Sequence, residues 1–242
     1  MVEHRFCKPR VVGSSPTAGL MTEARSQKLE VRRGITYVEL LVVLGLIPVI
    51  IGIISGVIRI QDYFKTSRDL QRFQDLNLLN SALNFYFQNA TSVDPDGPNL
   101  ENRGVDESLP TIFVSVPAEK DKFFESCFYY PNNKTYYIYQ TNKNDYQKIN
   151  GSGWIPINFL EVNYPALSSL PVDPINTLQS GLYYLYSFQR YPPQYEISAG
   201  FESAEFQKGG VGDRVSNDGG NDENRLELGT NLNLIPGFIF RF

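Results

Sequence analysis

The sequence predicts an α+β protein, in which a long N-terminal helix, half transmembrane and half amphipathic, packs on a small antiparallel sheet. An apolar run over 35–58 contains a single charge, Glu39. Helical spacing then continues over 62–89, a stretch with neither Gly nor Pro. Beyond it, short aromatic and β-branched runs alternate with turn-forming segments. About 20 apolar residues span a bilayer as a helix, so the first run is long enough to cross a membrane.

The charges that flank the apolar run predict how the helix is oriented. Within 21–33, four Lys or Arg residues outnumber two Glu residues, and the first charge after the run is Arg59. The positive-inside rule keeps such an N-terminal flank in the cytoplasm. We therefore expect a single-pass membrane protein whose N-terminus is cytoplasmic and whose C-terminal domain is extracytoplasmic. A secretory signal peptide is the weaker alternative, because its apolar core is shorter and a small-residue cleavage site follows it.

Glu39 is the one carboxylate inside the apolar run. An acidic residue near the centre of a membrane span costs roughly 2.5–3.5 kcal/mol on insertion scales, and less near an end, where Glu39 lies. The carboxylate either meets a positive partner or stays unpaired at the membrane interface, and the spacing alone leaves both interpretations open.

The start of the run resembles a known family. The residues Gly34-Ile-Thr-Tyr-Val-Glu-Leu-Leu-Val-Val-Leu-Gly-Leu-Ile, preceded by Arg32 and Arg33, are similar to the N-terminal signature of type IV pilins and type II secretion pseudopilins. The resemblance implies that a prepilin peptidase cuts between Gly34 and Ile35 on the cytoplasmic side and methylates the new N-terminus. It also implies that Glu39, five residues past the cut, is the assembly residue.

The resemblance is close over 32–60 and implies a pilin-like fold and a structural subunit, not an enzyme. Such a subunit polymerises through its N-terminal helix into a pilus or a pseudopilus, a filament used in protein secretion among other roles. The implied partners are the prepilin peptidase, other pilin or pseudopilin subunits and an inner-membrane assembly platform. Two positions depart from the signature: Ile35 replaces the usual phenylalanine, and Pro48 lies where many members have glycine. Proline removes a helical hydrogen bond, so we expect a kink at Pro48.

The resemblance also divides the chain into segments. These are the prepilin leader over 1–34, a transmembrane helix over 35–60, its amphipathic continuation over 61–91 and a β-rich pilin-like domain over 92–242. The leader is long for this class of signal. A start at Met21 would give a leader of 14 residues, so we interpret residues 1–20 as a wrongly assigned start.

Composition limits the chemistry available after the leader. The only histidine is His4, so the processed chain has no Ser–His or Cys–His nucleophile and no His-ligated zinc site. Its sole cysteine is Cys127, which excludes an internal disulfide. Residues 1–34 carry a net charge of +4 and the whole chain −4, so the remainder carries −8, which argues against nucleic-acid binding. The alternative to a filament subunit is a single-pass, membrane-anchored extracytoplasmic ligand-binding protein that does not polymerise. Carboxylate pairs formed by folding leave an enzyme as a third, more distant reading.

The amphipathic continuation is expected to end at Ala90–Thr91. Its charged residues, among them Asp69 and Arg72, are expected to lie mostly off the apolar stripe. The residues of that stripe, which should face the domain, are Leu70, Phe73, Leu76, Leu79, Leu83 and Phe87.

Strands are expected over 111–116, 123–130, 135–140 and 182–188, and a fifth over 195–201. The last two should form a hairpin. Within 195–201 apolar residues alternate with Glu196, Ser198 and Gly200, which predicts one buried and one solvated face. Trp154 is expected to be a packing anchor, and Asp173 to cap a turn through the backbone.

The acidic segment 216–224 is a candidate metal site. Asp218 and Asp222 lie among Asn and Gly residues, and Asp213 could be a further ligand for calcium, which prefers oxygen ligands. Major pseudopilins carry a calcium loop in this region, so the resemblance implies the same cation here. The spacing does not match an EF-hand, and a solvated acidic loop is the alternative. A bound calcium ion would tie the loop to the sheet in place of the missing disulfide.

Overall fold

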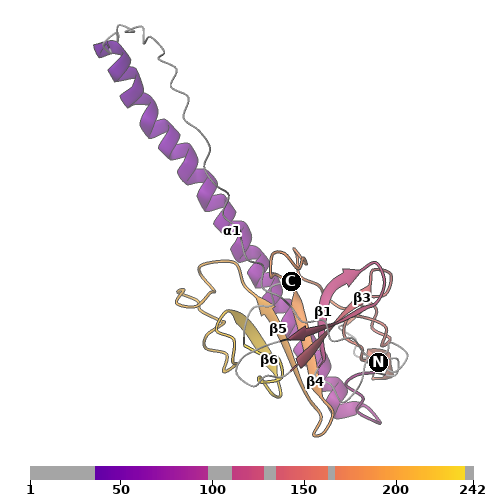
Figure 1. Ribbon diagram of the computed structural model, residues 1–242. Helices are drawn as coiled ribbons and strands as arrows, with labels where there is room; N and C mark the ends of the chain where they lie inside the picture. The colour runs from indigo at the N-terminus through magenta and orange to yellow at the C-terminus, as the bar shows by residue number, and fades with distance from the viewer. Residues whose placement is uncertain (1–35, 98–110, 128–134, 163–166, 238–242) are drawn as a thin grey trace, which may run out of the picture. The chain divides into compact units, whose positions relative to one another are not determined.

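The computed structural model describes residues 36–97, 111–127, 135–162 and 167–237. Helix α1, Tyr37–Asn89, contains 53 residues and continues through Pro48 without a break (Figure 1). Its first half is long and apolar enough to cross a membrane, as predicted. It ends at Asn89, one residue before the boundary predicted at Ala90–Thr91.

The second half of α1 packs on the globular domain. The position of Leu76, Leu79 and Leu83 in the core is confirmed, whereas Leu70 is 44% exposed. The prediction that charged residues lie off the buried face is wrong for Asp69 and Arg72, both of which are 0% exposed. Successive buried positions on this face are three or four residues apart, which keeps their side chains in one line. They are Asp69, Arg72, Leu76, Leu79, Leu83 and Tyr86.

A six-stranded mixed sheet forms the rest of the domain, in the order β2-β3-β1-β4-β5-β6 (Figure 1). Its strands are β1 Thr111–Ala118, β2 Lys122–Cys127, β3 Thr135–Asn142, β4 Tyr184–Gln189, β5 Gln194–Gly200 and β6 Arg225–Gly229. The prediction of a purely antiparallel sheet is wrong, because β1 and β3 are parallel. The reason is that β3 pairs antiparallel with β2 and then lies between β2 and β1. The predicted strand over 123–130 continues past β2 into residues outside the described part of the chain.

The β4–β5 hairpin confirms the prediction for this region. Antiparallel pairing runs from Tyr184 opposite Ala199 to Gln189 opposite Gln194. Trp154 is also the predicted packing anchor: its side chain is fully buried, and its Nε1 donates to the carbonyl of Pro171 at 3.0 Å. Strand β6 was not expected from the sequence.

Both faces of the sheet are covered. The face against α1 joins Leu79 and Leu83 to strand residues such as Tyr186 and Ile197 in one core cluster. A second cluster, on the other face, contains Ile112, Val114, Ile138, Tyr183, Leu185 and Ile235. The expectation of a solvated face on β5 is therefore wrong. Glu196 and Ser198 are both 0% exposed, because the segment that follows β6 covers this side of the strand.

Candidate functional site

The N-terminus of α1 carries the predicted assembly residue. Thr36 precedes the first helical residue, and its backbone N–H donates to Oε2 of Glu39 at 3.0 Å. In return, the backbone N–H of Glu39 lies 3.2 Å from the hydroxyl of Thr36. This reciprocal pair is a capping box, which satisfies two amides that the first helical turn leaves without partners. Gly34 and Ile35, the predicted cleavage site, lie outside the described residues.

The capping box gives Glu39 a partner within its own chain. Its carboxylate lies at the positive end of the helix dipole, which favours an anion there. The carboxylate is exposed, so it can accept further hydrogen bonds or a cation.

The apolar half of α1 is open over its whole described surface. Its large side chains, from Leu40 to Ile54, are all between 45% and 64% exposed. No Cβ at Gly45, Gly52 or Gly56 would meet any atom within 4 Å. Such a surface needs lipid or other helices around it.

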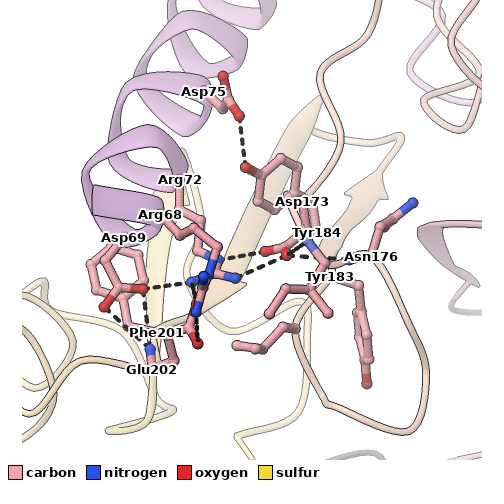
Figure 2. A network of polar contacts seen from close by, with 12 residues as sticks. Arg68, Asp69, Arg72, Asp75, Asp173, Asn176, Tyr183, Tyr184, Phe201 and Glu202 are labelled. Carbon is pink, nitrogen blue, oxygen red and sulfur yellow. Dashed lines mark hydrogen bonds and ion pairs between the residues drawn. The ribbon is translucent and has the colours of Figure 1, made fainter. Parts of the chain in front are cut away.

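A second group of charged residues fixes the amphipathic half of α1 to the domain, and Arg72 lies at its centre (Figure 2). Its Nε and Nη2 donate to the two carboxylate oxygens of Asp173 at 2.5 and 3.0 Å. Its Nη1 donates to Asp69 at 2.7 Å and to Glu202 at 2.8 Å. Arg72 and Asp69 are fully buried, and Asp173 is 2% exposed. Arginine suits this position because its planar fork bonds two carboxylate oxygens at once.

The carboxylates of this network are saturated by other donors as well. Asp69 accepts the backbone N–H groups of Glu202 and Ser203, the latter at 2.7 Å. Asp173 caps its own turn by accepting the N–H of Ile175 at 2.8 Å, as predicted. Arg68 closes the group with a bidentate contact to Glu202, with distances of 2.6 and 2.8 Å. Three segments far apart in the sequence are thus held together by hydrogen-bonded charges.

The ionisation of the network follows from these contacts. Burial alone would lower the pKa of Arg72, but its hydrogen bonds to Asp173, Glu202 and Asp69 outweigh burial and raise it. Burial would raise the pKa of Glu202, but the two arginines hold it below its usual value. Arg72 and Glu202 therefore stay charged at neutral pH. Each charged group in this network is paired with a neighbour of opposite charge. We call the network the clasp, and its members are Arg68, Asp69, Arg72, Asp173 and Glu202.

Sequence reasoning missed this clasp in part. It placed Asp173 correctly as a turn cap but gave it no cationic partner, and it did not consider Glu202. A signal was present: Asp69 and Arg72 continue the spacing of Leu76, Leu79 and Leu83 toward the N-terminus. Charged residues in register with a buried stripe indicate a buried ion pair when a partner lies elsewhere in the chain.

The structure also locates the three candidate calcium ligands. Asp213 accepts from the N–H groups of Gly209 and Ser216 and from the hydroxyl of Ser216, and these bonds lower its pKa to about 2. Asp218 accepts from the N–H groups of Gly220 and Glu227.

Asp222 accepts from the N–H of Asn224 at 3.0 Å. Within the described residues, no three His, Cys, Asp or Glu side chains are grouped as a metal ion requires. Calcium binding by Asp213, Asp218 and Asp222 stays a prediction.

No protein-family model matches the chain, and neither a curated protein nor a solved structure is significantly similar to it.

Proposed function

We propose that the chain is a structural subunit of a type IV pilus or a type II secretion pseudopilus. Prepilin peptidase would process it after Gly34, and it would polymerise through its N-terminal helix from the inner membrane. One observation carries the proposal. A single helix, α1, combines an exposed apolar half, a lone carboxylate in its first turn and a second half fixed to a sheet domain.

Assembly would use the surface that the single chain leaves open. In the membrane, lipid covers the apolar side chains of α1. In a filament, the same side chains would pack against neighbouring helices, and small residues such as Gly52 and Gly56 would let those helices approach closely. The same helix therefore suits both an inserted and an assembled state.

Glu39 would set the register between neighbouring subunits. An ion pair in an apolar environment is favourable when both partners are present, and a charge left alone there is costly. The α-amine of Ile35 from an adjacent subunit is a partner of the right sign, and the cut at Gly34 would create it. A neighbouring subunit at a different axial offset would leave both charges unpaired, so this ion pair would select one axial position.

Processing is the first test. Co-expression with an active prepilin peptidase is expected to yield a chain that begins at Ile35 and carries one additional methyl group. Intact mass and N-terminal sequencing of the membrane fraction measure both changes. The sequencing result does not depend on whether translation starts at Met1 or Met21.

A matched control is Gly34→Leu, which changes the residue before the cut and should remain full-length. Cleavage of a known prepilin in the same cells would show that the peptidase is active. If the wild-type chain stays uncut under those conditions, the filament proposal fails. The single-pass anchored protein that does not polymerise would then be the better interpretation.

A further inference from the structure

Between the apolar run and the clasp, α1 has a short neck, residues 59–67. In the described part of the chain, α1 first bonds to the domain at Arg68. The large apolar side chains of the neck, Ile60, Tyr63 and Phe64, are 57%, 72% and 56% exposed. The ring of Tyr63 contacts that of Phe64, with 6.3 Å between their centroids. Packing on the domain therefore does not explain why the neck carries these three side chains.

The neck is amphipathic. Its three large apolar residues have the spacing i, i+3, i+4, which places them on one side of the helix. The opposite side carries Gln61, Asp62 and Lys65. Asp62 and Lys65 are exposed enough to stay in water, with an N–O distance of 4.0 Å between them. A helical segment with one apolar and one charged side is typical of a helix at the boundary between lipid and water.

The position of the neck along α1 matches that boundary. Residues 60–64 lie about 3–9 Å beyond the last apolar residue, Ile58, because an α-helix rises 1.5 Å per residue. The headgroup layer on each side of the hydrocarbon core is about 5–7 Å thick. Helical side chains also lean toward the N-terminus, which here is the direction of the apolar run. The rings of Tyr63 and Phe64 therefore reach back into the headgroup layer.

The residue types in the neck also suit phospholipid. A tyrosine ring is apolar while its hydroxyl can stay in water, so tyrosine is enriched where membrane and water meet. Cations in the neck outnumber anions, since Arg59 and Lys65 stand against Asp62. Lipid phosphates attract such cations. A second copy of the chain is the less suitable occupant, because the processed chain carries a net negative charge and no lipid phosphate.

We propose that Ile60, Tyr63 and Phe64 form a lipid anchor, which inserts one side of the neck between the phospholipid headgroups of the leaflet from which α1 emerges. The anchor rests on the membrane insertion that the proposed function includes, but not on processing or polymerisation. Arg68 lies about one turn beyond Phe64. The anchor therefore fixes the height above the bilayer at which the clasp, and with it the domain, begins.

Tryptophan fluorescence of the full chain in phospholipid vesicles tests the lipid anchor. Trp154, the sole tryptophan, is buried in the domain, so the wild-type signal can be subtracted from that of a variant. In Tyr63→Trp, the added emission is expected to shift to the blue. It should also lose intensity when the lipids carry bromine on the upper part of their acyl chains. Because Tyr63 is exposed, the substitution should leave the fold intact, which circular dichroism checks.

Lys65→Trp is the matched control, because it places a tryptophan on the charged side of the same neck. The substitution removes the exposed ion pair with Asp62, which contributes little to stability. Its added emission should stay at the longer wavelength of an indole in water and should lose little intensity in brominated lipid. Both variants should remain in the membrane after carbonate extraction, since the apolar run is unchanged.

Two outcomes would overturn the lipid anchor while the chain stays inserted. Equal quenching of Tyr63→Trp and Lys65→Trp would show that lipid does not prefer the apolar side of the neck. Unquenched Tyr63→Trp would show that lipid does not bind that side. A blue emission that grows with the protein-to-lipid ratio would then assign it to a second copy of the chain. Extraction of the chain by carbonate would instead contradict membrane insertion, and the proposed function with it.

Discussion

Replacing Arg72 with alanine is expected to lower the free energy of unfolding by about 3–5 kcal/mol, the cost of removing one partner from a buried ion pair. The variant would leave Asp69 and Asp173 buried and without their guanidinium partner. Arg68 cannot replace it, because its guanidinium already makes both of its contacts to Glu202. Urea unfolding of the full chain in mild detergent measures the effect. The sole tryptophan, Trp154, is buried against Pro171 and reports on the same part of the core.

Two control variants show whether the loss of stability comes from the buried ion pairs of Arg72. Lys65→Ala removes an exposed ion pair to Asp62, with an N–O distance of 4.0 Å, and should change stability by less than about 1 kcal/mol. Arg72→Lys keeps the charge but loses the bidentate contact to Asp173, so an intermediate loss is expected. Equal losses for Arg72→Ala and Lys65→Ala would show that the clasp does not hold α1 to the domain.

The helix shows how far the sequence predicts this structure. The absence of Gly and Pro over 62–89 and the repeat of leucines predicted its length and the position of its core face. The buried face continues the spacing through Arg72 and Asp69, where hydrophobicity no longer marks it. What places these charges inside is Asp173, 101 residues after Arg72. A partner at that separation has no local signal, so helical periodicity places Arg72 and Asp69 on the buried face but does not identify Asp173 as the partner of Arg72.

In the sheet, too, local features could be predicted from the sequence, but contacts between distant segments could not. Strands β1 to β5 and the β4–β5 hairpin follow from local alternation and a short connection, whereas β6 does not. The parallel pairing of β1 with β3 depends on which strand β3 joins after its hairpin with β2, and nothing within β3 encodes that choice. Strand β5 alternates as a half-solvated strand does, yet Glu196 is buried because Leu234 and Ile235 lie over it. Cover by a distant segment overrides the local pattern.

The helix N-terminus was encoded locally. Thr36 and Glu39 have the spacing of a capping box, and this interaction exists in the single chain before any assembly. The carboxylate therefore has two separable properties: it accepts hydrogen bonds from its own helix, and it carries a negative charge. The family resemblance assigns the charge to assembly, whereas the structure shows the cap.

Glu39→Gln separates these two properties. Under the proposed filament function, it is expected to abolish filaments while leaving membrane insertion and processing intact. The amide oxygen can still accept the N–H of Thr36, so the cap persists, but it cannot neutralise an α-amine. An unpaired charge in an apolar core costs about 3–5 kcal/mol. That cost raises the concentration needed for assembly more than about a hundredfold. Electron microscopy and sheared-filament yield measure the loss.

The reciprocal control is Thr36→Val, which removes the hydroxyl that accepts the backbone N–H of Glu39. The variant keeps the charge of Glu39 and the hydrogen bond from the backbone N–H of residue 36 to the Glu39 carboxylate. Loss of a capping side chain costs about 1 kcal/mol, so this variant should still form filaments, at a yield reduced less than tenfold. Normal filaments from Glu39→Gln together with none from Thr36→Val would assign Glu39 to the cap alone. The partner of the carboxylate in the assembled state would then be its own helix, and the axial register would have to come from packing of the exposed apolar face of α1.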